Sequence, residues 1–543
     1  MKTLRLLLFS FLTLLCSLSG LRAQPTDEAI RQAMKAATQA MMDKVSYRGG
    51  FVWYYLTDGS RQWGELEAKP TMVWMQSPGT PQVGHILLDA YHATNDEYYY
   101  QAAQTVAGAI IWGQQEEGGW NYVFDYAGEG SLKSWYATVG RSAWRLEEFQ
   151  HYYGNSTYDD GGTMDAAKFL LRMYVEKNDP TYRPALDKVI RLVLNSQYPS
   201  GGWPQRYPLM YDHPFQGQAD YSSFITLNDD VMPDIIEFLT MCYQAIGLRE
   251  AREPVMRAMY LMIALQQGAP YAGWADQYTT EDLRPAHARS YEPRSVNTGT
   301  TARMVRLMLS YYRLTGDTRF LSGIPAALDF IQSVKLPAEE VKKWTRRPRT
   351  ADDILVPRFI QPETGEPLYV HRRGTNVVNG MYYTDQELAN TIAHYSSAAY
   401  INVKALRQEY EEALQTPPAD LAKNSPFIGD ELVPLPRYFT NFRGSGPDRA
   451  TSASMLDDAA RLIGSLNADG FWIVPLRNTS NPYKPNPGSE SSTSTQYATT
   501  MVGDEYDTSP YPCTTGEQCI STGDYINNMR TLIEALSTLN GEE

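Results

Sequence analysis

The chain has 543 residues, of which 43% are hydrophobic, so it is long enough to bury a large core. It carries 62 acidic and 48 basic residues, which gives a formal net charge of −14 at neutral pH. This negative charge repels phosphate backbones and anionic lipids, and it excludes nonspecific binding to nucleic acid or to an anionic membrane surface. If the ligand is itself acidic, the positive charge that receives it must be local.

Residues 1–23 have the pattern of a secretory signal peptide. Two basic residues precede an apolar run from Leu6 to Leu18, and small residues lead up to Ala23. The run is too short to remain in a membrane, and Cys16 follows a leucine where a lipoprotein signal has a small residue. We therefore predict an exported protein (periplasmic, cell-surface or secreted) that is not inserted in the membrane after cleavage. Removal of the segment changes the formal charge from −14 to −17.

Apolar periodicity predicts four consecutive helical hairpins. In residues 231–246 the apolar side chains recur every three or four residues, which is the period of one helical face. The predicted pairs are 82–92 with 97–112, 164–176 with 182–196, 231–246 with 251–266, and 302–314 with 318–333. Because a hairpin alone leaves apolar surface exposed, we expect the pairs to stack around a ring as an all-α (α/α) barrel or toroid.

A glutamine followed by a Gly-Trp pair recurs after the outer helices. The copies begin at Gln114, Gln197 and Gln266 and end at Trp120, Trp203 and Trp274, and a weaker copy ends at Trp472. We interpret these tryptophans as structural wedges between repeats rather than as platforms for sugar rings.

The later part of the chain is less regular. We expect a long loop or a short-stranded insertion at 336–385, a helix at 388–415, surface loops at 416–450 and 473–524, and a last amphipathic helix that includes Ile526 to Leu539. After the signal peptide, residues 24–543 are predicted to form one catalytic domain, with 416–543 wrapped on the ring.

Three cysteines remain after the signal peptide. Cys242 lies on an apolar helical stripe and is expected to be buried. Cys513 and Cys519 are six residues apart in a polar loop, and a small disulfide can form between them in an exported protein.

Polar residues gather in three loops that precede inner helices: 157–163, 226–230 and 287–292. Each loop follows a Gly-Trp copy, so all three are expected at one end of the ring. A helix cap needs one side chain, but two of the loops carry adjacent acids, whose repulsion calls for a cation or a substrate. Oxygen ligands of this kind suit Ca²⁺, whereas the spacing of His and Cys does not fit zinc.

Four blocks, 201–208, 225–232, 288–292 and 358–372, resemble the family 10 polysaccharide lyases, the pectic acid (pectate) lyases with an (α/α) toroid fold. The blocks lie in family order within roughly residues 155–385. The resemblance implies a pectate lyase that cleaves polygalacturonate with the help of Ca²⁺ to give 4,5-unsaturated oligogalacturonates, and we expect it to act as a monomer.

Carried onto this chain, the resemblance implies roles for eight residues. Arg289 would be the base that removes a proton from the sugar. Asp159 and Asp229 would lie at the bound calcium. Arg358 and Arg372 would bind substrate carboxylates, and Asn228, Asp160 and Asp230 would be neighbours in the same cleft.

Arginine is an unusual base because its pKa of about 12.5 or higher keeps it charged. A calcium-bridged substrate and nearby cations would favour the neutral form and would acidify the C5 proton. No lysine lies between Lys188 and Lys335, so the central repeats lack the more familiar base. His287 is a competing candidate, or a hydrogen-bonding loop residue.

Two other functions stay open. An inverting glycoside hydrolase could use Asp159 and Asp229 as its two carboxylates. A pectin-binding protein with impaired catalysis is the second alternative, because Asp160 stands where the family pattern has Asn and Asn297–Thr301 lacks the family's Ser/Glu pattern.

Overall fold

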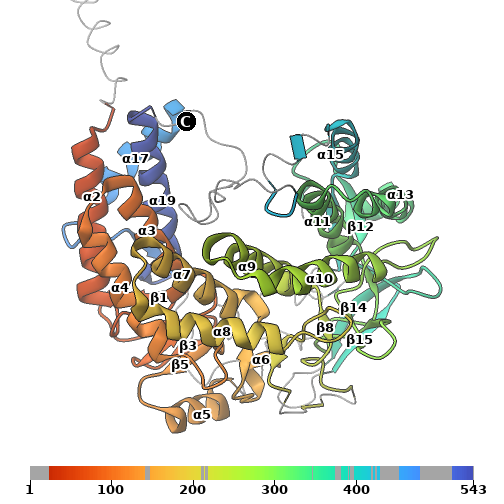
Figure 1. The fold of residues 1–543 in the computed structure, drawn as a ribbon, viewed down its shortest axis with the longest axis horizontal. Helices are drawn as coiled ribbons and strands as arrows, with labels where there is room; N and C mark the ends of the chain where they lie inside the picture. Colours follow the sequence, from red (N-terminus) through yellow and green to blue (C-terminus); the bar gives the residue numbers. More distant parts are fainter. Residues whose placement is uncertain are drawn as a thin grey trace, which may run out of the picture.

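The computed structural model describes residues 24–140, 147–209, 213–214, 218–344, 347–373, 381–388, 391, 397–417, 420–421, 425–428, 452–476 and 516–541. Helical hairpins follow one another along an arc, with one helix of each pair in an inner layer and the other in an outer layer (Figure 1). The predicted (α/α) class is therefore confirmed. The predicted signal peptide lies outside the described residues.

Four hairpins each pair an inner helix with the outer helix that follows it. They are α3 (Thr80–Thr94) with α4 (Glu97–Trp112), α7 (Gly162–Lys177) with α8 (Arg183–Asn195), α9 (Val231–Ile246) with α10 (Arg252–Ala264), and α11 (Thr298–Thr315) with α13 (Ile324–Ser333). The segment predicted as one helix at 318–333 is divided at Gly323, after the short α12 (Arg319–Ser322). A side chain at Gly323 would collide with Gln266, which explains why glycine stands at this position.

The Gly-Trp tryptophans are buried wedges, as predicted. Each indole nitrogen donates to a carbonyl of the helix that has just ended, at 2.7–2.9 Å. The pairs are Trp120 with Ile110, Trp203 with Val193, Trp274 with Met262 and Trp472 with Leu462. Because a buried indole N–H needs a partner, this bond sets the position at which the chain turns back toward the inner layer.

The glutamine of each main copy joins one repeat to the next. The Gln197 amide donates to the carbonyl of Gly201 in its own loop and to that of Pro254 in α10, both at 2.9 Å. Gln114 makes the same pair of bonds to the carbonyls of Gly118 and Ala185, and Gln266 makes it to those of Ala272 and Gly323. The motif is therefore a connection between successive hairpins.

Short strands precede three of the inner helices: β6 (Ser156–Thr157) before α7, β8 (Ile225–Thr226) before α9, and β11 (Val296–Asn297) before α11. The region 336–385 is a short-stranded insertion, the second of the two forms expected. It contains α14 (Ala338–Lys343), β12 (Ile354–Pro357), β13 (Phe359–Ile360), β14 (Pro367–Arg373) and β15 (Met381–Asp385). The sheet order β11-β13-β14-β15 attaches this insertion to the start of α11.

Two predictions for the later chain are wrong in part. Within 388–415, residues Ala398–Ile401 form β16, which pairs with β12, and the helix α15 begins only at Val403 and runs to Gln415. Within 473–524, β17 (Ile473–Pro475) pairs with β18 (Gln518–Ser521), and α19 begins at Thr522. In both places pairing with a distant strand overrides the local composition. Residues 429–451 and 477–515 lie outside the described part.

The two ends of the chain lie together. The first described helix, α2 (Asp27–Ala40), packs against α17 (Ser452–Ser465) and α19 (Thr522–Leu539), and β1 (Tyr54–Leu56) pairs with both β18 and β2 (Gln62–Trp63) (Figure 1). None of the described helices is long and apolar enough to span a membrane. Cys242 is buried as predicted, whereas Cys513 lies outside the described residues, so its bridge to the buried Cys519 stays a prediction.

Replacement of Gln197 by alanine is expected to destabilise the fold by about 2 kcal/mol, because it removes hydrogen bonds to two main-chain carbonyls and one from Arg257. Chemical denaturation measures the change. Gln408→Ala is the control. Within the described residues that exposed amide bonds only to Glu412 on its own helix, so the effect should stay within about 0.5 kcal/mol. Equal effects of the two substitutions would contradict a role in joining repeats.

Candidate active site

Two acidic turns lie against each other at the entrances to α7 and α9. The turn η3 (Asp159–Gly161) follows β6, and η5 (Asn228–Asp230) follows β8. Both turns hold acidic residues in the left-handed backbone region, with φ of 49° at Asp160, 51° at Asp229 and 55° at Asp230. Such conformations cost roughly 1–3 kcal/mol each and often mark functional sites. Two matching strained turns side by side indicate one here.

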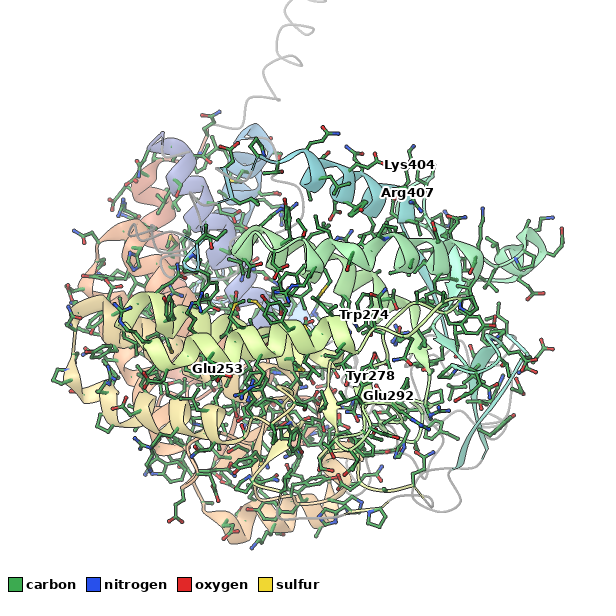
Figure 2. All side chains as sticks on the ribbon, turned by 45° about the vertical axis from the view of Figure 1, so that its right-hand side comes forward. Glu253, Trp274, Tyr278, Glu292, Lys404 and Arg407 are labelled. Carbon is green, nitrogen blue, oxygen red and sulfur yellow. The ribbon has the colours of Figure 1, made fainter. Side chains whose placement is uncertain are left out.

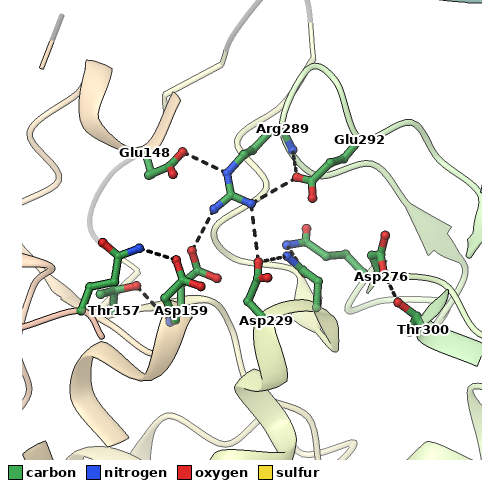
Figure 3. A network of polar contacts seen from close by, with 12 residues as sticks. Glu148, Thr157, Asp159, Asp229, Asp276, Arg289, Glu292 and Thr300 are labelled. Atoms are coloured by element: carbon green, nitrogen blue, oxygen red, sulfur yellow. Dashed lines mark hydrogen bonds and ion pairs between the residues drawn. The ribbon is translucent and has the colours of Figure 1, made fainter. Parts of the chain in front are cut away.

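Arg289 stands between the two turns and is only 2% exposed. It comes from the segment between β10 (Pro285–Ala286) and β11. Its Nη2 donates to Asp159 at 2.8 Å, and its Nη1 lies 3.8 Å from Oδ2 of Asp229. Its Nε donates to Glu148 at 3.0 Å and its Nη1 to Glu292 at 3.2 Å (Figure 3). The predicted convergence of three loops is confirmed, although the structure surrounds the arginine with four carboxylates.

Residues upstream of the acidic turns hold them in place. The Tyr122 hydroxyl donates to Asp159, and Gln76 donates to Asp160 at 2.6 Å and to Glu65 at 2.9 Å. Sequence reasoning missed these residues because each is a common type that comes from another repeat. The only sequence signal was the place of Tyr122, two residues after the Gly-Trp tryptophan.

The helix α6 (Glu147–Gln150) supplies two further acids that were not predicted. Glu148 binds Arg289, and the neighbouring Glu147 accepts from the backbone N–H of Ser290 at 3.0 Å and from its hydroxyl. Both carboxylates are about 5% exposed. The arginine and the residue after it are therefore fixed by one short helix.

A second buried guanidinium belongs to Arg206, which lies in the Gly-Trp block 201–208. It stands 5.0 Å from the ring centre of Tyr122 and 4.4 Å from that of Tyr153, and it donates to Asn121 at 3.2 Å and to Asn155 at 3.4 Å. None of its hydrogen bonds to the described residues goes to a carboxylate. Arg206 therefore brings positive charge close to Tyr122, the partner of Asp159.

The third Gly-Trp loop is bonded to the turn η5. The carbonyl of Asp276 accepts from the N–H groups of Leu227 and Asn228, and the Asn228 amide donates to Asp229 at 2.8 Å. Asp230 is more open and lies 3.4 Å from Arg303 of α11. Figure 2 shows Trp274, Tyr278 and Glu292 gathered near one end of α10, with Glu253 toward its other end. All three loops thus reach the same side of the repeats.

The altered segment Asn297–Thr301 has a structural role. The Asn297 side chain caps α11 by accepting from the N–H of Gly299 and of Thr300, and its amide donates to Asp276 at 2.7 Å. Thr300 also donates to Asp276 (Figure 3). The segment therefore secures α11 to the third Gly-Trp loop.

The remaining predicted residues are not bonded to Arg289 in any contact described above. Arg358 is half-buried between β12 and β13, and its backbone is bonded to Ser397 and to Thr298 at the start of α11. Arg372 lies in β14, opposite Tyr382, and its side chain is outside the described part. His287 Nε2 donates to the carbonyl of Ala219 at 3.1 Å, which favours its interpretation as a loop residue.

Burial changes the ionisation of the acids around Arg289. It raises the pKa of Asp229 to about 7, of Glu147 to about 7 and of Glu292 to about 8. Burial, followed by the charge of Asp159, also raises the pKa of Asp160 well above its usual range. The cluster also holds more acidic groups than its positive charges can neutralise. An added cation would therefore be favoured.

The donors present fit a hard cation such as Ca²⁺. Asp159 is fully buried, and its Oδ1 has no hydrogen-bond partner among the described residues. Carboxylate oxygens of Asp159 and Asp229, from the two touching turns, are the ligands that Ca²⁺ prefers. In the described part of the chain, no three His, Cys, Asp or Glu side chains form a finished metal site. Water, amide oxygens, main-chain carbonyls or a substrate carboxylate would complete the coordination of a cation here.

Several solved structures resemble this one at low identity. A family 10 polysaccharide lyase from Cellvibrio cellulosa is 17% identical, with 52% of this chain and 84% of that chain covered and a TM-score of 0.36. A variant of that enzyme, solved with trigalacturonic acid, is 18% identical, with coverages of 53% and 86% and a TM-score of 0.36. The α-1,6-mannanase of Salegentibacter sp. HEL1_6 is 10% identical, with coverages of 94% and 99% and a TM-score of 0.34.

No protein of curated function matches the sequence. The family model described as pectic acid lyase matches residues 114–387, which is just over half of the chain. This range starts at the first Gly-Trp copy and contains both acidic turns, Glu148 and Arg289. The chain belongs to the pectic acid lyase family, and it is a polysaccharide lyase.

Proposed function

We propose that this enzyme cleaves polygalacturonate by Ca²⁺-assisted β-elimination and releases 4,5-unsaturated oligogalacturonates. The observation that carries the proposal is the position of Arg289, whose guanidinium meets Asp159 and approaches Asp229 within a family of pectic acid lyases. An inverting hydrolase would have no need of an arginine between its two carboxylates.

The reaction begins at C5 of a galacturonate unit, where the proton is α to a carboxylate. Its removal places a second negative charge on that unit, so the surroundings must supply positive charge at the moment of transfer. The electron pair then forms the C4–C5 double bond, and the glycosidic oxygen at C4 leaves and takes up a proton. Water is not a reactant.

Arg289 is the proposed base. Four acidic side chains surround Arg289 in the described structure, and their ionised forms stabilise its charge, so it must lose some of these contacts before it can act as a base. A Ca²⁺ ion held by Asp159 and Asp229 would supply positive charge to the substrate carboxylate and would take these two acids from the arginine. Arg289 would then lie beside the polyanionic substrate with fewer carboxylates bound to its own guanidinium.

The other residues of the cleft would orient the polymer. Arg358 and Arg372 are proposed to bind carboxylates of neighbouring sugar units, since a guanidinium pairs with a carboxylate through two parallel hydrogen bonds. Asn228, Asp160 and Asp230, which belong to the acidic turns themselves, would be neighbours of the bound polymer. We also propose export through residues 1–23, which would bring the enzyme to its polymer outside the cytoplasm.

Incubation of the protein with polygalacturonate and Ca²⁺ is expected to produce ultraviolet absorbance from unsaturated uronates, and a chelator should abolish it. Reducing ends that appear without this absorbance would instead identify a hydrolase. Binding without either signal would leave the catalytically impaired protein as the surviving alternative.

Arg289→Lys is expected to lower kcat by about 10²–10⁴-fold, the usual contribution of a positioned base, because the lysine nitrogen cannot replace the guanidinium at that position. The same assay measures it, and thermal unfolding checks that the variant is folded. Arg294→Ala in the same segment is the control, since this exposed residue pairs with Glu363. Retained activity in Arg289→Lys would exclude Arg289 as the base.

The raised pKa of Glu147 predicts a pH-dependent cost to stability. The folded protein holds a proton on this carboxyl up to about pH 7, whereas the unfolded chain releases it near pH 4.5, so stability falls as the pH rises between these values. Glu147→Gln should remove that part of the fall. Relative to wild type, the variant should be about 3 kcal/mol more stable at pH 8 than at pH 4. Urea unfolding at the two pH values measures this.

Glu129→Gln is the matched control for that experiment, because Glu129 is exposed and paired with Lys133. The hydrogen bond from Lys133 holds the pKa of Glu129 below its usual value, so any change in the stability of this variant relative to wild type should run in the opposite direction. A similar change in the control and in Glu147→Gln would show that the effect does not come from the buried acid.

A further inference from the structure

A cavity of about 470 Å³ lies where the inner helices α3 and α19 begin. Its wall includes Tyr54 of β1, Ser77 just before α3, Gln82 in the first turn of α3, Ser521 at the end of β18, and residues from Gly523 to Arg530 of α19. This volume is within the range of about 300–1,000 Å³ found for small-molecule sites. Every residue that lines it is outside the segment 114–387 that defines the family.

The polar groups of this cavity suit an acidic sugar. Nε of Arg530 is buried and has no hydrogen-bond partner within the described part of the chain, while its Nη1 donates to Asn527 at 3.2 Å. A guanidinium with a free donor is well suited to a carboxylate. Asp524, Asn527 and Gln82 add acceptors and donors for hydroxyl groups, and the ring of Tyr54 adds an apolar face.

Two hydrogen bonds connect the cavity wall to the repeat that carries Asp159. Gln76, directly before Ser77, donates to Asp160, and Gln82 donates to Asp165 in the first turn of α7, each at 2.6 Å. The start of α19 is held to the same region, because Thr522 donates to the carbonyl of Trp53 and the Trp53 indole donates to that of Gln76. The cavity thus opens at the same end of the inner helices as the acidic turns.

The order of the inner helices places this cavity along the path of a bound polymer. Helix α19 packs against α3, α3 against α7, and α7 against α9. Neighbouring helices lie about 8–10 Å apart, so the cavity is roughly 10–20 Å from the acidic turns. An extended polysaccharide that crosses the turns would reach it several sugar units away from the bond that is cut.

We propose that this cavity is a distal subsite in which Arg530 binds the carboxylate of one uronic acid unit of a long substrate. The inference rests on the proposed function, since it takes the polymer in the cleft to be an acidic polysaccharide. It implies that the enzyme prefers chains long enough to span from α19 to α9, and that residues outside the family segment set this preference.

The test compares oligogalacturonates of three to ten units as substrates of Arg530→Gln. We expect a loss of about tenfold in kcat/KM for the ten-unit chain and no change for the shortest chain that is cleaved. Asn527→Ala, at an exposed position, should give a smaller loss with the same dependence on length. Losses that are equal at all lengths, or absent at all lengths, would overturn the subsite.

Arg461→Gln provides the matched control. Arg461 lies on the neighbouring helix α17, is exposed, and pairs with Asp458 one turn away, much as Arg530 bonds to Asn527. The Arg461→Gln variant loses the same single positive charge as Arg530→Gln, and it should cleave oligogalacturonates of every length as wild type does. A length-dependent loss in this control would show that net charge, and not the cavity, is responsible.

Failure of the proposed function is distinguishable from failure of the subsite. If wild type gives no unsaturated product, the lyase proposal falls, and the subsite is then tested by calorimetric titration with the ten-unit oligogalacturonate. Weaker binding by Arg530→Gln than by Arg461→Gln supports the subsite. Equal binding by both variants, or no binding by wild type, overturns it.

Discussion

The hydrogen bonds made by the backbone of the Gly-Trp tryptophans determine where the active-site residues stand. The carbonyls of Trp120, Trp203 and Trp274 accept from the N–H groups of Thr157, Thr226 and Asn297 at 2.8, 3.2 and 2.8 Å. Each accepting tryptophan ends the loop that follows an outer helix, and each donating residue lies in the short strand that leads into an inner helix. Because the same bond recurs in three repeats, the three strands end at the same height along the inner helices. Side chains from different repeats can therefore meet there.

The two acidic turns follow from this repetition, and their residues correspond. Thr157 and Thr226 occupy the same place, so Asp159 corresponds to Asn228 and Asp160 to Asp229, as their φ angles of 49° and 51° confirm. The two acids near Arg289, Asp159 and Asp229, are therefore not equivalent members of the repeat. One cleft is built from two copies of one turn, each contributing a different position.

Much of the fold followed from the sequence, because helical periodicity and the Gly-Trp copies are local signals. The bounds of α4 and α9 agree with the expected 97–112 and 231–246, and Asp159, Asp229 and Arg289 do meet. Glu148 was missed, since nothing in its neighbourhood marks it as the partner of a residue 141 positions away. The start of α15 was missed for a similar reason, because β12 draws the preceding residues into a strand.

Asp160 departs from the family pattern, but this departure adds less negative charge than an ordinary aspartate would. Where the family pattern has a neutral amide, this chain has an acid, but burial and the nearby Asp159 raise its pKa well above the usual range. A protonated carboxyl is close to an amide in size, and it still offers the oxygen that accepts from Gln76. The raised pKa favours the neutral form, which is closer to the family pattern and repels a polyanion less than an ordinary aspartate would. A cation bound beside Asp160 would favour the charged form.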